Sequence, residues 1–347
     1  MGYFKNIKFE LTADNSAGLF DEKVGDIFHS RTGALKEAQE KFINPILNLL
    51  SYFPDTINVL DICYGIGYNT KALFQNLGIN NINVDALEYN QELIFLSPFI
   101  KDEIFNDDLK LFLINQILAF AEKKEDIASV LAAVTEPEYK EFISPFTMQY
   151  IDNINSNSYV TNPFDNKQLF LHNIYYKYIS QSMKSYIKPA KYQDSSINFY
   201  SGDARKSIFL TKNMYDVIFL DAFSPQKDPT LWTIDFLAIL KLKMKQNSIL
   251  VSYSKSAPFR SALLELGFYV GKTIINNTDM GTVASFNSYL IQNKLTKDDI
   301  NIIETRSGIP YRDINLSLNA NEIIINRSIE GAASTRVSRT QFEKMFY

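Results

Sequence analysis

The stretch INVLDICYGIGYNTKALFQNLG, Ile57 to Gly78, passes from a mostly apolar strand through a turn with two glycines into a helix. The strand ends near Asp61, and the turn holds Gly65 and Gly67. Glycines at this point let the main chain approach a ligand at the start of the following helix. Gly78 is typical of the glycine that closes a helix. The stretch therefore predicts the first strand–turn–helix repeat of an α/β fold.

The same alternation continues along the chain. We expect further strands at 82–88, 197–203, 215–221, 248–254 and 268–274, with helical patterns between most of them. Strands that alternate with helices favour a doubly wound, mostly parallel sheet. We therefore predict an α/β fold of the Rossmann-like type.

Three parts are expected along the chain. Residues 1–56 suggest a small β-ribbon or ordered arm followed by a first helix, and residues 57–292 hold the sheet. Residues 293–347 are more irregular and basic, and we expect them to pack on that domain as a C-terminal extension. Between about 100 and 196 the alternation stops, which indicates a helical insertion after the second strand.

Composition excludes several classes of protein. A net charge of −4 over 347 residues argues against a general nucleic-acid binder, although a local basic path remains possible. One cysteine, Cys63, rules out a disulfide framework, and we interpret it as a buried packing residue. His29 and His172 do not have the spacing of metal ligands, so we expect no metal. No signal peptide or apolar run of membrane length is found, which predicts a cytoplasmic protein without a membrane partner.

The residues of the glycine turn indicate which ligand it holds. A dinucleotide fold requires a third glycine where Thr70 stands. Asp61, just before the glycines, would repel a pyrophosphate and attract an ammonium. S-adenosyl-L-methionine carries an ammonium and no phosphate, so we expect it as the cofactor; a purely structural turn is the alternative. The cofactor-binding residues expected in this motif are Asp61, Tyr64, Gly65, Gly67 and Asn69.

Acids also end the next two strands. Glu88 can accept from both ribose hydroxyls of an adenosine, although a solvated strand-end carboxylate would look the same. In SGDAR, residues 201–205, Asp203 can accept from the adenine amino group while the main chain of Ala204 donates to the ring. The carboxyl ends of parallel strands meet at one edge, where ligands bind in such sheets. The combination is a stronger signal than any single acid.

The fourth strand, in VIFLDAFSPQKDPTLWT at 217–233, ends on Asp221. Methyl transfer from a sulfonium is a direct displacement, so the protein has to orient an amine and desolvate it. An alkylamine has a pKa of about 10, so we expect Asp221 to accept its hydrogen bonds and take its proton. Capping of the next turn is the alternative role. We expect Phe223, Ser224 and Pro225 to bind the substrate.

Six segments, taken together and in order, resemble the MnmC-type methyltransferase family. They are DIFHSRTGALKEAQEKFI (26–43), LDICYGIGYNT (60–70), SGDAR (201–205), YDVIFLDAFSPQKDPTLWT (215–233), MGTVAS (280–285) and GIPYRD (308–313). The resemblance implies a Rossmann-like, S-adenosylmethionine-dependent methyltransferase. It implies methylation of the aminomethyl group of 5-aminomethyl-(2-thio)uridine at tRNA wobble position 34, which gives 5-methylaminomethyl-(2-thio)uridine.

The resemblance also assigns roles and partners. Asp61, Gly65, Gly67, Glu88 and Asp203 would line the cofactor, and Asp221 would face the amine. Residues 28–40, which include the candidate substrate residue His29, would fold over the cofactor side; His29 could equally be structural. The partner would be the anticodon stem-loop of tRNA. Nothing after the sheet resembles the FAD-dependent oxidase to which some members are fused, so a separate enzyme would supply the aminomethyl group.

Other interpretations remain. YDVIFLDAFSP also resembles a spermidine synthase motif, so an aminopropyltransferase or another small-amine methyltransferase is the alternative. A non-catalytic RNA-binding protein or an NAD-dependent oxidoreductase fits less well, because the strand-end acids are present and Thr70 replaces the third glycine. For tRNA we expect a basic path from Lys255, Arg260, Lys272 and the arginines of the C-terminal extension. Those arginines are Arg306, Arg312, Arg327, Arg336 and Arg339.

Overall fold

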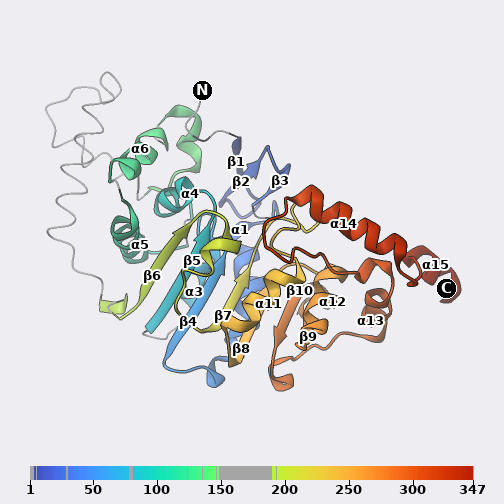
Figure 1. Cartoon of the computed structure of the whole chain (residues 1–347). Coiled ribbons are helices and arrows are strands. Elements are labelled where there is room, and N and C mark those ends of the chain that lie inside the picture. The colour runs from blue at the N-terminus through green and yellow to red at the C-terminus, as the bar shows by residue number, and fades with distance from the viewer. Residues whose placement is uncertain are drawn as a thin grey trace, which may run out of the picture. The chain divides into compact units, whose positions relative to one another are not determined.

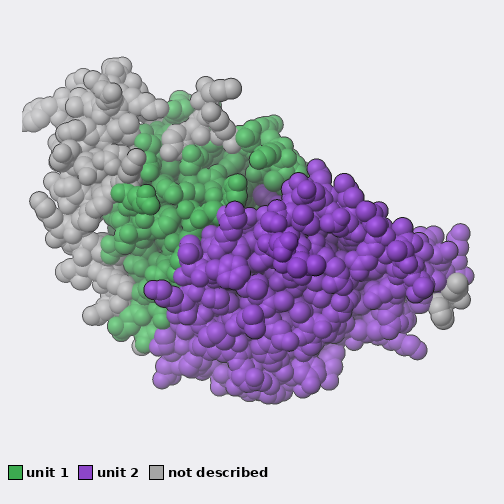
Figure 2. Space-filling model, viewed as in Figure 1, with its two compact units in different colours: residues 1–39, 64–202 green, residues 40–63, 203–347 purple. Residues whose placement is uncertain are grey.

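The computed structural model describes residues 4, 6–28, 30–77, 81–102, 104–122, 124–134, 136–145, 147, 190–192 and 194–346. Two compact units are distinguished within it (Figure 2). The first unit comprises residues 1–39 and 64–202, and the second comprises residues 40–63 and 203–347. The expected division at residues 56 and 292 stays a prediction. The expected substrate residue His29 and the histidine His172 lie outside the described residues.

A seven-stranded sheet is the main element of the fold (Figure 1). Its strands are β4 (Thr56–Ile62), β5 (Asn81–Glu88), β6 (Ser196–Ser201), β7 (Tyr215–Leu220), β8 (Met244–Ser252), β9 (Tyr269–Ile275) and β10 (Thr278–Ser285). The order is β6-β5-β4-β7-β8-β10-β9. β5 pairs with β6 in parallel, and β7 pairs in parallel with both β4 and β8. The predicted α/β fold with a mostly parallel sheet is confirmed.

The strand β10 was missing from the sequence prediction. It runs antiparallel to both β8 and β9. Asn276 and Asn277, with φ of 49° and 62°, join β9 to β10 and adopt the left-handed conformation of a tight hairpin turn. Two successive asparagines were the local signal for this hairpin. The segment MGTVAS, quoted above as a family motif, lies within β10.

The described helices follow the strands in the expected alternation. They are α1 (Ala34–Glu37), α2 (Asn44–Leu47), α3 (Tyr68–Asn76), α4 (Gln91–Leu96), α5 (Asp107–Phe120), α6 (Lys124–Val134), α10 (Ala204–Ser207), α11 (Ile234–Lys243), α12 (Ala257–Glu265), α13 (Lys297–Glu304), α14 (Ala320–Ala333) and α15 (Arg339–Phe346). Short 3-10 helices cover Leu50–Tyr52, Ser97–Phe99, Pro137–Phe142, Ala190–Tyr192, Ser288–Leu290 and Arg306–Gly308. No helix in the described part of the chain combines the length and the apolar character that crossing a bilayer requires.

The first predicted helix is interrupted. A π-helical segment, Ala38–Ile43, separates α1 from α2. Pro45 lies in the first turn of α2 and has no N–H to donate to the carbonyl one turn earlier. Local rewinding of this kind is a common response to such a residue. The apolar stripe nevertheless stays buried, and Phe42 packs edge-on against Phe219 of β7 with ring centroids 5.7 Å apart.

The N-terminal arm forms the predicted β-ribbon. Its three strands, β1 (Ile7–Leu11), β2 (Ala17–Asp21) and β3 (Asp26–Ile27), make a separate antiparallel sheet. Within the first unit, the hydroxyl of Tyr68 in α3 donates to the carbonyl of Ala17 (2.9 Å). The hydroxyl of Ser16 accepts from the N–H of Ala34 in α1 (3.2 Å). The ribbon is thus joined to the helix that follows the glycine turn.

The insertion after β5 is helical where it is described. α5 and α6 belong to it, and residues 148–189 lie outside the described residues. Phe112 of α5 stacks on Tyr192 with ring centroids 5.1 Å apart. Gln116 of α5 accepts from the main-chain N–H of Ile197 in β6 (3.0 Å). These contacts attach the insertion to β6 and to the residues that precede it.

Candidate active site

The glycine turn after β4 is built from left-handed residues. Cys63, Gly65 and Gly67 have φ values of 65°, 56° and 80°. This region favours glycine, so the two glycines meet a requirement of the backbone. Gly67 is the N-cap residue of α3, and its own lack of a side chain means that no side-chain cap is made at this end of the helix. Cys63 is only half-buried, so our interpretation of it as a buried packing residue is wrong.

Tyr64 supports the turn from within the protein. Its ring is 2% exposed and packs edge-on against Phe199. Its hydroxyl donates to the hydroxyl of Ser97 (2.8 Å), which in turn donates to the carbonyl of Ile66 (2.8 Å). A Cβ on Gly67 would lie 2.3 Å from the Tyr64 hydroxyl oxygen, so a larger residue cannot fit there. A ligand in the turn could reach the main chain of Tyr64 and not its hydroxyl.

Glu88, at the end of β5, binds the same turn. Oε2 accepts from the N–H of Gly65 (2.7 Å) and Oε1 accepts from the N–H of Asn90 (2.9 Å). Burial raises the pKa of this carboxyl, and the main-chain hydrogen bonds from Asn90 and Gly65 act in the opposite direction. The expected contact of Glu88 with a ribose stays a prediction. No pattern in the sequence indicated that Glu88 would also position the glycine turn.

A buried ion pair anchors the helix that starts at the turn. Lys71 of α3 and Asp102 are fully buried, with Nζ 2.6 Å from Oδ2. Nζ also donates to the carbonyl of Ser97 (2.7 Å). Burial lowers the pKa of Lys71, and the charge of Asp102 opposes that shift. Asn69, a predicted cofactor residue, lies in the first turn of α3 and is 5% exposed.

In the second unit, Asp61 and Asp221 lie at the carboxyl ends of neighbouring parallel strands. Asp61 of β4 is opposite Phe219 of β7, and the N–H of Asp221 donates to the carbonyl of Ile62 (3.2 Å). Asp61 is fully buried and Asp221 is half-buried. The strand pairing therefore places both acids at the carboxyl edge of the sheet, with Asp221 two residues beyond the β7 residue opposite Asp61, and their positions in the sequence predicted this edge. Their chemical roles stay predictions.

The loop after β7 is fixed by two aromatic side chains. The indole N–H of Trp232 donates to the carbonyl of Phe223 (2.8 Å). The hydroxyl of Tyr253 donates to the carbonyl of Ala222 (2.8 Å). The Trp232 side chain is fully buried, with its ring edge-on to Phe259. Trp232 is thus a core residue that anchors the loop.

The predicted substrate residues lie on this held loop. Phe223 and Ser224 are half-buried, and Pro225 is buried. The carbonyl of Ser224 accepts from the N–H groups of Lys227 (2.8 Å) and Asp228 (3.0 Å), which closes a turn directly after Pro225. Pro225 and Pro229 restrict the main chain of the loop. The structure adds side-chain donors from the far end of the loop and from the residue that follows β8.

Asp203 already has a cationic partner. It caps α10, and its carboxylate binds Arg205 through Nη2 (2.7 Å) and Nε (3.1 Å). Burial raises the pKa of Asp203, but the hydrogen bonds from Arg205 outweigh it and leave the pKa below its usual value. Arg205 also binds the buried Asp313 (2.9 Å). The segments SGDAR and GIPYRD are therefore joined by an ion pair. The contacts of Asp203 and of the buried Ala204 with adenine stay predictions.

Comparison with known proteins places the chain among its relatives. Residues 166–284 match a family model described as S-adenosyl-L-methionine-dependent methyltransferase. The chain is 31% identical over 326 residues to the uncharacterized protein MJ0670 of Methanocaldococcus jannaschii, which covers 91% of this chain and 70% of that protein.

Two further likenesses concern MnmC. Over 76 residues the chain is 30% identical to the tRNA 5-methylaminomethyl-2-thiouridine biosynthesis bifunctional protein MnmC of Paracidovorax citrulli. This match spans 22% of the chain and only 12% of that protein. The crystal structure of MnmC2 from Aquifex aeolicus superposes with a TM-score of 0.62, covering 96% of this chain and 88% of that one. The identity in that superposition is 22%, so the likeness concerns the fold.

Proposed function

Since this chain belongs to the same family as MJ0670 and is an S-adenosylmethionine-dependent methyltransferase related to MnmC, we propose that its substrate is tRNA. The proposed substrate is the aminomethyl group of 5-aminomethyl-(2-thio)uridine at wobble position 34. The product is 5-methylaminomethyl-(2-thio)uridine. The fold, the enzyme class and the cofactor predicted from the sequence are confirmed.

The residues around the glycine turn fit this cofactor chemically. The left-handed turn lets the main chain approach a ligand closely, and Asp61 and Glu88 supply carboxylates suited to an ammonium and to hydroxyls. The chain residues proposed to hold the cofactor are Asp61, Tyr64, Gly65, Gly67, Asn69, Glu88, Asp203 and Ala204. When bound, S-adenosylmethionine supplies a methyl group carried on a sulfonium.

The position of Asp221 is the observation that carries the proposal. An alkylamine with a pKa of about 10 is unprotonated in only about one molecule in a thousand at pH 7. A carboxylate that accepts hydrogen bonds from the amine can orient its lone pair and receive its proton. Asp221 lies beside the strand of Asp61, at the start of a loop that Trp232 and Tyr253 hold in place. We propose that Phe223, Ser224 and Pro225 form the walls of the amine site.

The choice of tRNA as substrate is supported by the MnmC relatives. The printed name of the Paracidovorax citrulli protein places that protein in the biosynthesis of 5-methylaminomethyl-2-thiouridine in tRNA. Methylation as the last step requires a nucleoside that already carries an aminomethyl group. We infer that a separate activity installs this group before the present enzyme acts.

The test is methyl transfer from labelled S-adenosylmethionine to tRNA bearing 5-aminomethyluridine at position 34. We expect Asp221→Ala to reduce the rate at pH 7 by about 10²- to 10⁴-fold, because the amine loses its proton acceptor. Asp221→Asn keeps an oxygen acceptor, so its rate should recover more as the pH rises toward the pKa of the amine. Asp298→Ala, which removes an exposed carboxylate from α13, serves as the control.

Two outcomes would contradict the proposal. Full activity of Asp221→Ala would remove Asp221 from the reaction. Absence of methylation of this tRNA by the wild type would remove the substrate, provided that the protein still binds S-adenosylmethionine in a direct titration.

A further inference from the structure

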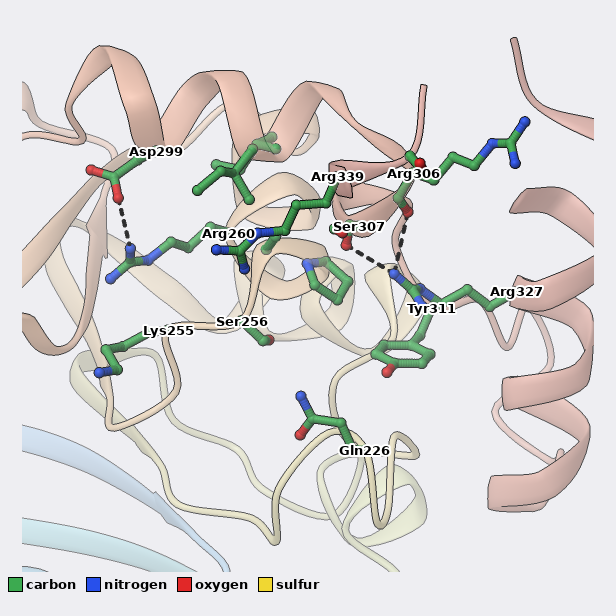
Figure 3. Close-up of a pocket in the computed structure, with 15 residues that line it drawn as sticks. Gln226, Lys255, Ser256, Arg260, Asp299, Arg306, Ser307, Tyr311, Arg327 and Arg339 are labelled. Atoms are coloured by element: carbon green, nitrogen blue, oxygen red, sulfur yellow. Dashed lines mark hydrogen bonds and ion pairs between the residues drawn. The ribbon is translucent and has the colours of Figure 1, made fainter. Parts of the chain in front are cut away.

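A strongly basic cavity lies within the second unit. Its volume is about 570 Å³, and Figure 3 shows Lys255, Arg260, Arg327 and Arg339 around it, with Gln226 at one side. The charged residues that line it are Lys255, Arg260, Arg306, Arg327 and Arg339, together with the single carboxylate Asp299. Its lining thus has an excess of positive charge in a chain whose net charge is −4.

The carboxylate of Asp299 does not neutralise the other cations of the cavity, because it is already paired with Arg260 and Lys272. Arg260 is 4% exposed and pairs with Asp279 (2.9 Å) as well as with Asp299 (3.6 Å). Lys272, which does not line the cavity, binds Asp299 at 2.8 Å. Burial tends to raise the pKa of Asp299, but the hydrogen bonds from Lys272 and Thr296 lower it to about 2. Arg260 and Lys272 are therefore engaged in ion pairs, and their expected place in a basic path for tRNA stays a prediction.

The other cations of the lining are held in place mainly by main-chain carbonyls. Arg327 donates to the carbonyls of Ile309 (2.6 Å) and Ser307 (2.8 Å) and lies 4.8 Å from the centre of the Tyr311 ring. Arg306 donates to the carbonyl of Arg336 (2.8 Å). A carbonyl fixes the orientation of a guanidinium without cancelling its charge. Within the described part of the chain, no carboxylate lies at ion-pair distance from Arg306 or Arg327.

The two remaining cations are exposed and can turn toward a ligand. Lys255 donates to the carbonyl of Asp279 (3.0 Å). Arg339 makes a surface ion pair with Glu343 (2.8 Å), and its side chain is 57% exposed. Exposed pairs of this kind contribute little free energy, so an incoming anion can replace the carboxylate. The cavity therefore combines guanidiniums held by main-chain carbonyls with exposed cations.

We propose that this cavity binds the phosphate backbone of the RNA substrate, an inference that rests on the proposed function. Gln226 on its wall directly follows Pro225 of the proposed amine site. A nucleic acid whose target base enters that site would have its neighbouring phosphates within reach of the cavity. Arginine and lysine on such phosphates position the nucleic acid without reading its sequence. The local excess of positive charge explains how an acidic protein can dock a polyanion.

The experiment compares the binding of an unmodified tRNA transcript at several salt concentrations. We expect Lys255→Glu to weaken binding at least fivefold and to reduce the slope of log K against log salt by about 1. The double change Lys255→Glu with Arg339→Gln should have a larger effect. Lys212→Glu reverses the charge of another exposed lysine of the second unit, just before β7, and should bind like the wild type. Unchanged affinity for S-adenosylmethionine shows that each variant is folded.

Three results would decide the matter. Wild-type RNA affinity and salt slope in both cavity variants would overturn the proposal. If Lys255→Glu weakens the binding of inorganic pyrophosphate and leaves the affinity for RNA unchanged, the cavity binds a small phosphorylated molecule. That result would also overturn the proposal. RNA binding that depends on Lys255 and Arg339 in a protein that fails to methylate 5-aminomethyluridine would support the cavity and contradict the proposed function alone.

Discussion

At the scale of single residues, Cys63 shows how the backbone conformation of the glycine turn limits which residue types suit it. The turn requires three left-handed residues, and only two of them are glycines. A side chain with a Cβ in this conformation costs about 1–2 kcal/mol, whereas glycine adds about 0.5–1 kcal/mol of entropy to the unfolded chain. The balance favours glycine slightly, so Cys63 leaves strain in the turn.

We expect Cys63→Gly to be more stable than Cys63→Ala by about 0.5–1 kcal/mol, because both lose the sulfur and only glycine relieves the backbone. Cys63→Val should be less stable than Cys63→Ala, since a branched side chain tolerates positive φ poorly. Urea unfolding of the three variants measures these differences. An alanine variant at least as stable as the glycine variant would show that the turn is unstrained at this position.

Glu88 and Asp203 show how much residue type and sequence position reveal about a candidate binding residue. Their positions at strand ends identified them as candidates for binding adenosine. The structure adds a partner for each: the N–H of Gly65 for Glu88 and the guanidinium of Arg205 for Asp203. Gly65 lies 23 residues from Glu88 in the chain and meets it only through folding. A carboxylate at a strand end can hold a neighbouring segment of the main chain in place and also be a candidate for binding a ligand.

At the scale of elements, the loop after β7 depends on one donor from its own far end, Trp232, and on one from the residue that follows β8, Tyr253. Its prolines restrict the unfolded chain, which lowers the cost of ordering the loop. The hydrogen bonds from Trp232 and Tyr253 then decide where the carbonyls of Phe223 and Ala222 lie. The orientation of Asp221 follows from these contacts, because it immediately precedes Ala222.

We expect Trp232→Phe to lower the free energy of unfolding by about 1–3 kcal/mol, because the carbonyl of Phe223 loses its donor. The same change should lower kcat for methyl transfer while the affinity for S-adenosylmethionine stays the same. Phe259→Leu is the control, since it alters the packing around Trp232 without removing the hydrogen bond. If both variants lose activity in proportion to stability, the hydrogen bond has no role of its own in positioning the loop.

At the scale of the whole molecule, charge is distributed unevenly. The net charge of −4 gave no indication of an anion-binding surface. The cavity of the second unit gathers cations from residues 255–260, 306, 327 and 339, and Asp279 and Asp299 are occupied by ion pairs with Arg260 and Lys272. Net charge therefore says little about a local site in a protein of this size.

Binding of the cofactor should stabilise the whole fold. At a concentration of 100 Kd, S-adenosylmethionine adds about 2.7 kcal/mol to the free energy of unfolding, which raises Tm by several degrees. Asp221→Ala should keep this shift, because that residue is proposed to face the substrate. Asp61→Asn should lose most of it, and NAD should give none to the wild type. Thermal unfolding followed by circular dichroism measures all four cases; a shift with NAD would contradict the cofactor assignment.

The sequence alone determined the local features of this protein. Strand and helix periodicity, the glycines of the turn and the acids that end the strands are encoded within a few residues of each other. They were sufficient to predict the α/β fold, the methyltransferase class and the cofactor, with the resemblance to MnmC adding the substrate to be tested.

Only the tertiary structure decided the partners of those residues. The hydrogen bond from Tyr253 to Ala222, the hydrogen bond from Gly65 to Glu88, and the cation-lined cavity join residues far apart in the chain. β10 was missed although its turn was encoded locally, because its short, polar beginning hides the strand pattern. Contacts between distant residues depend on how elements pack, and no periodicity along the chain records them.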